Sequence, residues 1–172
     1  SGPNGFSSSL QNPVISPITT AGSGTYSLSV TVNGCNSTPV TTSVVIYPIP
    51  NSIATSNSPA CIGQSINLSS TTYANATYSW TGPNGWTSSA QNPVITNVTA
   101  ANAGTYTVSA IANGCIGTPS STIVVVNPIP AAPVLSNNAP MCSGQTLNLT
   151  AQNVVGGTFN WTGPNSFSDR KS

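Results

Sequence analysis

Short runs of alternating apolar and polar residues cover the chain, and none has the spacing of an amphipathic helix. The runs are bounded by Gly, Pro, Asn and Ser, which favour turns. In the middle of the chain the pattern predicts strands over Ser52–Thr55, Ser65–Thr71, Thr77–Thr81, Val94–Val98, Thr105–Ile111 and Thr118–Val126. The Asn113-Gly114 pair before the last of them predicts a two-residue hairpin turn. The sequence therefore predicts an all-β fold.

The same pattern recurs along the chain with a period of about 80 residues. The landmarks that keep this step are Trp80-Thr-Gly-Pro-Asn-Gly-Trp86 with Trp161-Thr-Gly-Pro-Asn-Ser-Phe167, Gly24-Thr-Tyr26 with Gly104-Thr-Tyr106, Asn33-Gly-Cys35 with Asn113-Gly-Cys115, and Pro48-Ile-Pro50 with Pro128-Ile-Pro130. Six strands in one period suit a two-sheet sandwich. We expect residues 48–127 to form one complete repeat, residues 1–47 the second half of a repeat, and residues 128–172 the first half of another.

The two half-repeats are complementary, and two explanations remain open. The chain is a section of a much longer protein, or the C-terminal strands of one subunit are completed by the N-terminal strands of the next. The joints at Pro48-Ile-Pro50 and Pro128-Ile-Pro130 are short and rich in proline, which predicts stiff connections. A rod or filament of β-sandwiches is the expected architecture.

Charge is almost absent from this sequence. No Asp, Glu, Lys, Arg or His precedes Asp169, and the formal net charge is +1. General acid–base catalysis and hard-cation sites need such side chains, so we predict no enzyme activity, no metal and no cofactor. The balance also argues against nucleic acid as a partner, and the apolar runs are too short to span a membrane. A nearly neutral surface favours association, so the expected partner is a neighbouring repeat or subunit, arranged head to tail.

Several of these motifs carry a family resemblance. Ala103-Gly-Thr-Tyr106-Thr-Val108 resembles the strand-F signature of the immunoglobulin superfamily, with Val108 where that family usually has a cysteine. The whole unit, with Cys-x-Gly-Gln, Trp-Thr-Gly-Pro-Asn-Gly, Gly-Thr-Tyr and Asn-Gly-Cys, resembles the immunoglobulin-like repeats of large Bacteroidota surface proteins. These include gliding-motility-associated adhesins exported by type IX secretion. The resemblance implies tandem immunoglobulin-like sandwiches on the cell surface or in a secreted filament, and a structural, non-catalytic role in an adhesin stalk.

The resemblance also assigns the large side chains of each repeat. We interpret Trp80, Trp161, Tyr26 and Tyr106 as core residues, together with Leu68 and Val108; a carbohydrate platform is the alternative. An aromatic residue also follows each Gly-Pro-Asn turn, at Phe6, Trp86 and Phe167. We expect these rings to be exposed, where they can stack on a glycan or on a neighbouring domain. A glycan-binding module using this ring is therefore the alternative function.

Two further sets of residues are candidates for modification. In an exported protein Cys35, Cys61, Cys115 and Cys142 are expected to be oxidised. In an immunoglobulin-like fold the start of strand B and the end of strand F lie at opposite ends. We therefore predict a disulfide from the strand-B cysteine of one repeat to the F–G cysteine of the next, and none between Cys61 and Cys115. Asn-x-Ser/Thr triplets, which are glycosylation acceptors or chance products of the composition, occur at Asn36, Asn67, Asn75, Asn97, Asn148 and Asn160.

Overall fold

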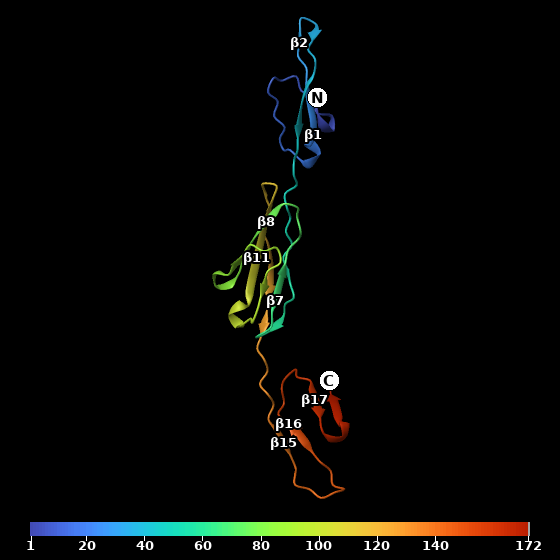
Figure 1. The fold of residues 1–172 in the computed structure, drawn as a ribbon, viewed down its shortest axis with the longest axis vertical. Helices are drawn as coiled ribbons and strands as arrows, with labels where there is room; N and C mark the ends of the chain where they lie inside the picture. Colours follow the sequence, from blue (N-terminus) through green and yellow to red (C-terminus); the bar gives the residue numbers. More distant parts are fainter. Residues whose placement is uncertain (172) are drawn as a thin grey trace. The chain divides into compact units, whose positions relative to one another are not determined.

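The computed structural model describes residues 1–171, and within them it contains strands and short 3-10 turns but no α-helix. No helix in this part of the chain is long and apolar enough to cross a membrane. Contacts divide the chain into two units, Ser1–Pro128 and Ile129–Ser172, and the first holds the one complete sandwich (Figure 1). The all-β prediction is therefore confirmed.

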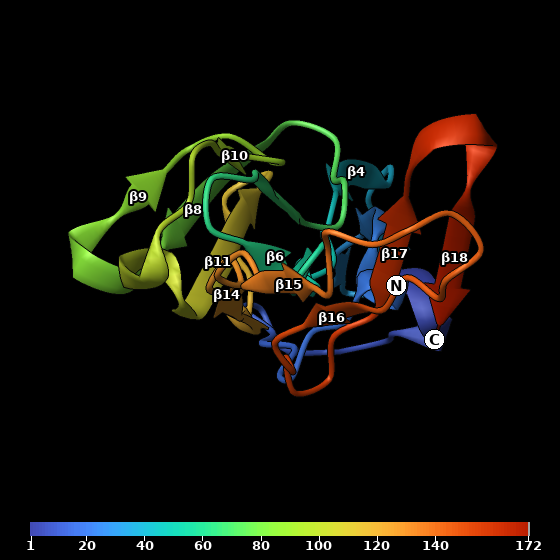
Figure 2. The same cartoon turned by 90° about the horizontal axis from the view of Figure 1, so that it is seen from below.

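The complete sandwich is built from two antiparallel sheets. One has the order β9-β8-β11-β13 and the other β10-β7-β5. The hairpin strand β12 extends the first sheet, and β14 pairs in parallel with β6 (both labelled in Figure 2). The bounds are β5 (Thr55–Ser56), β6 (Ala60–Cys61), β7 (Ile66–Ser69), β8 (Ala76–Thr81), β9 (Thr87–Ser88), β10 (Val94–Ile95), β11 (Gly104–Ala112), β12 (Cys115–Ile116), β13 (Ser120–Val124) and β14 (Val126–Asn127), with 3-10 turns η3 (Pro83–Gly85) and η4 (Ala100–Asn102).

Most of the expected strands are present at shifted or shortened bounds. The hairpin prediction is confirmed, because Asn113 and Gly114 both have positive φ and connect the paired residues Ala112 and Cys115. The expected strand over Thr118–Val126 is divided into β13 and β14. The sequence pattern does not predict the short strands β6, β9 and β12, because two residues are too few to show an alternation.

The core lies between the two sheets. Its buried apolar side chains are Ala60, Ile66, Leu68, Trp80, Ile95, Val98, Tyr106, Val108 and Val124. In β11 every second residue from Tyr106 to Ala112 is buried, as expected for a strand with one face on a core. The indole N–H of Trp80 donates to the carbonyl of Gln91 at 3.2 Å, so this buried ring leaves no donor unpaired.

The strand order defines the class of fold. Strands β5, β7 and β10 occupy the positions of A, B and E, while β9, β8, β11 and β13 occupy those of C′, C, F and G. A buried tryptophan lies on the C strand, and the hydroxyl of Tyr106 donates to the carbonyl of Asn102 at 2.9 Å. This tyrosine corner and this topology make the central unit an immunoglobulin-like sandwich.

The two flanking segments contain strands and 3-10 turns of their own, and their interpretation as half-repeats stays a prediction. Residues 1–47 contain η1 (Pro3–Gly5), η2 (Thr20–Gly22), β1 (Gly24–Leu28), β2 (Thr31–Val32), β3 (Cys35–Asn36) and β4 (Val40–Val44), with β1 paired to β4 and β2 to β3. Residues 129–171 contain β15 (Leu135–Asn137), β16 (Leu149–Ala151), β17 (Phe159–Thr162), η5 (Pro164–Ser166) and β18 (Ser168–Lys171), with β15 paired to β16 and β17 to β18.

Candidate functional site

The recurring turn motif packs directly on the tyrosine corner. A Cβ added to Gly82 would lie 2.5 Å from the Tyr106 ring, and one added to Gly104 would lie 2.8 Å from the Pro83 ring. The Trp86 ring stands edge-on to Tyr106, with centroids 5.2 Å apart and an interplanar angle of 72°. The two glycines therefore allow a close approach that any side chain would block.

Asn84 also stabilises this turn, through its backbone conformation and a side-chain hydrogen bond. It has φ of +54°, a conformation that asparagine tolerates better than most residues, and Gly85 follows with φ of +74°. The Asn84 side-chain amide donates to the carbonyl of Ala101 at 2.8 Å. The Trp-Thr-Gly-Pro-Asn-Gly and Gly-Thr-Tyr motifs thus recur together because they form one packed unit, which we call the corner lock.

The corner lock is repeated in the N-terminal segment. A Cβ on Gly2 would clash with the Tyr26 ring, and the Phe6 ring is edge-on to Tyr26 with centroids 5.7 Å apart. The Tyr26 hydroxyl donates to the carbonyl of Gly22 at 2.9 Å. Two sequences with different aromatic residues after the turn therefore make the same glycine–tyrosine and ring–ring contacts.

The predicted core residues divide into two groups. Leu68, Trp80, Tyr106 and Val108 lie in the core of the complete sandwich. Tyr26 and Trp161 are only half-buried, because the segments that hold them lack the opposing strands. Burial raises the pKa of the Tyr106 phenol above its ordinary value, and the side chain of Asn102 opposes this shift.

The predicted exposure of the turn aromatics is partly wrong. Trp86 is half-buried because its ring packs on Tyr106, and Phe6 is half-buried on Tyr26. Phe167 remains 50% exposed. The possibility that these rings contact a glycan or another domain stays a prediction. The six candidate acceptors Asn36, Asn67, Asn75, Asn97, Asn148 and Asn160 are all exposed, and their glycosylation also stays a prediction.

The Cys-x-Gly-Gln motif forms a tight turn. The backbone N–H of Cys61 donates to Oε1 of Gln64 at 2.8 Å, and the N–H of Gln64 donates to the carbonyl of Cys61 at 3.1 Å. Cys142 and Gln145 make the same two bonds. Cys61, which the sequence analysis names as the strand-B cysteine, lies in the short strand β6 that precedes β7.

The two cysteines of the complete sandwich lie at its opposite ends. Cys61 pairs with Asn127, the residue from which the chain leaves the sandwich. Cys115 lies in the F–G hairpin, where Thr118 donates to the carbonyl of Pro50 at 3.3 Å as the chain enters. All four cysteines are free in the described part of the chain. Because their predicted partners lie in other repeats, the predicted pairing is not tested.

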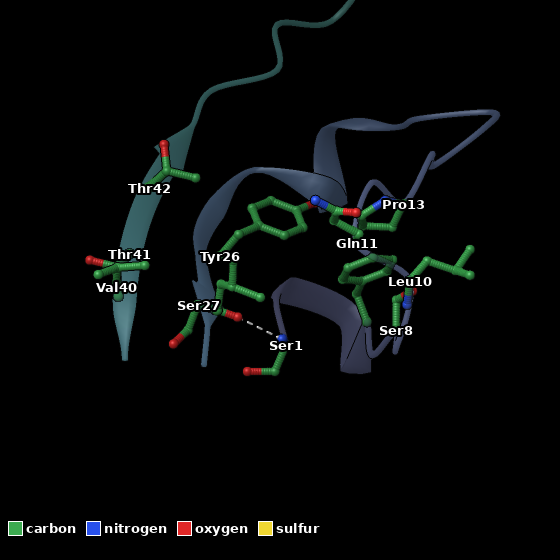
Figure 3. A pocket seen from close by; sticks show the side chains of 12 residues that line it. Ser1, Ser8, Leu10, Gln11, Pro13, Tyr26, Ser27, Val40, Thr41 and Thr42 are labelled. Atoms are coloured by element: carbon green, nitrogen blue, oxygen red, sulfur yellow. Dashed lines mark hydrogen bonds between the residues drawn. The ribbon is translucent and has the colours of Figure 1, made fainter. Parts of the chain in front are cut away.

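A hollow of about 290 Å³ opens on the N-terminal segment. Leu10, Tyr26, Leu28 and Val40 line it together with several polar residues, and Figure 3 shows Tyr26 between strand residues and the loop that carries Leu10 and Gln11. In the complete sandwich, β7 and β8 fill the corresponding space. The hollow is therefore the uncovered half of a core.

Among the described residues no three His, Cys, Asp or Glu side chains come together. The prediction that the chain carries no metal, cofactor or catalytic activity stays a prediction. The structural features that recur are the corner lock and the two cysteine-bearing ends of the sandwich.

No protein-family model and no curated protein matches the chain. Solved structures that resemble it include an amphioxus IgVJ-C2 molecule, with 19% identity, a TM-score of 0.45 and 63% of each chain covered. They also include the Ig1 domain of mouse SynCAM 2, with 13% identity, a TM-score of 0.35, and 45% of this chain and 98% of that chain covered. Sidekick-1 immunoglobulin domains 1–4 match at 16% identity and a TM-score of 0.32, covering 83% of this chain and 44% of that chain.

The chain thus spans under two thirds of the length of the amphioxus and Sidekick-1 structures. At these identities and scores the comparisons add no argument about function. The assignment to the immunoglobulin-like fold rests on the strand order and the tyrosine corner of the chain itself.

Proposed function

We propose that the chain is a structural segment of the stalk or filament of an extracellular bacterial surface adhesin. The observation that carries this proposal is the path of the chain through the complete sandwich. The chain enters beside the F–G hairpin, where Asn51 bridges Thr118, and leaves beside the β6–β7 turn, where Ile62 donates to the carbonyl of Asn127. A domain entered at one end and left at the other extends an array with every copy added.

The linkers and the surface fit the same role. Both joints carry the Pro-Ile-Pro sequence, which restricts the backbone and limits bending. A surface almost free of charge allows like repeats to lie close without repulsion.

Length per repeat tests the stalk role. One or two extra copies of residues 48–127 are inserted after Asn127, and small-angle scattering measures the maximum dimension of the monomer. Strand β11 has nine residues, about 30 Å at the usual rise per residue. We therefore expect each added repeat to lengthen the particle by a constant increment of about 30–40 Å. An increment that shrinks with each repeat would mean that the repeats pack into a globule, and would contradict a stalk.

Surface location needs a separate experiment. Antibodies against the chain are applied to intact and to permeabilised cells of the source organism, with a cytoplasmic marker protein as the control. We expect labelling of intact cells that is removed by external protease. Labelling only after permeabilisation would contradict the extracellular assignment without affecting the length experiment.

The alternative function, a glycan-binding module, predicts a different result. Trp86 would have to present its ring to a sugar while half of it stays packed on Tyr106. Substitution Trp86→Ala would then abolish binding on a glycan array, whereas Trp161→Ala would leave it unchanged. No binding by the parent chain would remove this alternative.

A further inference from the structure

Cys61 is held beside the residue through which the chain leaves the complete sandwich. Its strand β6 pairs in parallel with β14, and this register places Cys61 opposite Asn127. The N–H of Ile62 donates to the carbonyl of Asn127 at 2.9 Å. On the other side of the cysteine, the N–H of Ala60 donates to the carbonyl of Val125 at 3.1 Å. Backbone hydrogen bonds on both sides of Cys61 therefore fix its place at the exit.

Cys115 is held beside the residue through which the chain enters. Its Sγ lies 3.9 Å from the carbonyl oxygen of Tyr47. The chain after Tyr47 is bound to the same end of the sandwich, because the hydroxyl of Thr118 donates to Oδ1 of Asn51 at 3.2 Å. The hydroxyl of Tyr73 donates to the carbonyl of Asn51 at 2.7 Å and accepts the N–H of Asn51 at 2.9 Å. The place of Cys115 relative to the entering chain is therefore also fixed.

The entry residue and the exit residue occupy the same position in the repeat. Tyr47 and Asn127 each stand directly before Pro-Ile-Pro. Where one complete repeat follows another, a single linker residue is therefore the exit of the first and the entry of the second. Its carbonyl accepts the N–H of Ile62 in the first repeat and lies beside the Sγ of Cys115 in the second. Because Cys61 is bonded directly to Ile62, one cysteine from each repeat lies next to the same carbonyl group.

No bridge within one repeat can use these two cysteines. Cys61 and Cys115 lie at opposite ends of the sandwich, whereas a disulfide joins Cα atoms about 4.4–6.8 Å apart. Cys61 is exposed and Cys115 is half-buried, so both thiols can react with a group outside their own repeat. Each joint between complete repeats thus brings together one thiol from either side.

We propose that, wherever two complete repeats follow each other, Cys61 of the first and Cys115 of the second form a disulfide across the joint. This proposal rests on the tandem arrangement of the proposed stalk. The Sγ–Sγ bond forms when the two thiols lose two electrons and two protons to a small disulfide such as oxidised glutathione, which is reduced to two thiols. An extracellular location supplies oxidising conditions. The bridge adds a second covalent connection beside the Pro-Ile-Pro linker, so it restricts rotation at the joint and shares a pulling force.

The bridge is tested in the chain with one extra copy of residues 48–127 inserted after Asn127. Ile62→Val in the first copy and Ile116→Val in the second mark the two cysteine-containing peptides by mass, without changing a cysteine. The chain is oxidised with glutathione at low protein concentration, alkylated and digested with pepsin. We expect the main bridged peptide to carry both marks. A main product with one mark or with none, or cysteines that are all alkylated, would overturn the proposal.

Two matched serine variants give a second test in the same unmarked chain. Cys61→Ser in the first copy should abolish the loss of two hydrogen atoms that intact mass records on oxidation. The same substitution in the second copy should leave this loss unchanged. Both variants replace an exposed side chain, so the core of each sandwich is kept. An equal effect of the two variants would contradict the pairing.

The length experiment, carried out on the reduced chain, tests the stalk role independently of this bridge. A constant increment in length without a bridge would overturn the disulfide and leave the stalk standing. An increment that shrinks with each repeat would contradict the stalk even if a bridge formed.

Discussion

The hydroxyl group of Tyr106 provides a direct test of the corner lock. Tyr106 is buried, and its hydroxyl donates to the carbonyl of Asn102 at 2.9 Å. Substitution Tyr106→Phe keeps the ring, and with it the contacts to Gly82 and Trp86, and removes only this bond. A hydrogen bond of this kind contributes about 0.5–1.5 kcal/mol. We expect the variant to lose about 1 kcal/mol of unfolding free energy at neutral pH.

The pH dependence of this loss has a definite sign. Burial raises the pKa of Tyr106 above its ordinary value, and the side chain of Asn102 opposes the shift. In the unfolded chain the phenol ionises at about pH 10, before the folded one does. The stabilisation that comes from the raised pKa of Tyr106 is therefore fully present below about pH 10, and it is lost as the pH rises through the pKa of the folded state. The parent should lose stability above this pH more steeply than the Phe variant, so the difference between them narrows.

Urea unfolding followed by tryptophan fluorescence measures both effects. A Trp161→Phe background leaves Trp80 and Trp86, which report on the complete sandwich alone. Tyr26→Phe removes the same type of bond in the N-terminal segment and is the control that should not move this transition. Equal stability of parent and Tyr106→Phe at neutral pH, or a difference that widens above about pH 10, would refute the reasoning.

Three further predictions concern stability: the first two use the same urea unfolding, and the third uses thermal unfolding. Substitution Gly82→Ala places a Cβ 2.5 Å from the Tyr106 ring, in a backbone that is extended. This overpacking should lower the free energy of unfolding by about 1–3 kcal/mol. An unchanged midpoint of urea unfolding would contradict the corner lock. Substitution Ser70→Ala removes a buried hydroxyl that has no hydrogen-bond partner, at a position where the next repeat has Ala151. The free energy of unfolding should stay unchanged or rise by up to about 1 kcal/mol. The melting temperature should change little between about pH 4 and 8, because few groups titrate in this range. It should also change little between low and moderate salt, because there are few charges to screen. A steep change in either series would contradict this reasoning.

The sequence by itself determined the strand class, the repeat and the F–G hairpin. These features are local: alternation marks one buried face, and the Asn113-Gly114 pair adopts the positive φ values that the turn needs. The family resemblance, and not the local pattern, assigned Trp80 and Tyr106 to the core. The repeat also showed that the corner motifs recur together, without giving the reason.

Only the tertiary structure decided what these motifs contact. The closeness of Gly82 to Tyr106, the half-burial of Trp86 and the parallel pairing of β6 with β14 join residues far apart in the sequence. Leu28 and Val108 both fit the alternating pattern of a strand, but Leu28 is exposed and Val108 is buried. The difference arises because burial depends on which strands lie opposite, and strands brought together from distant positions leave no mark in the local pattern.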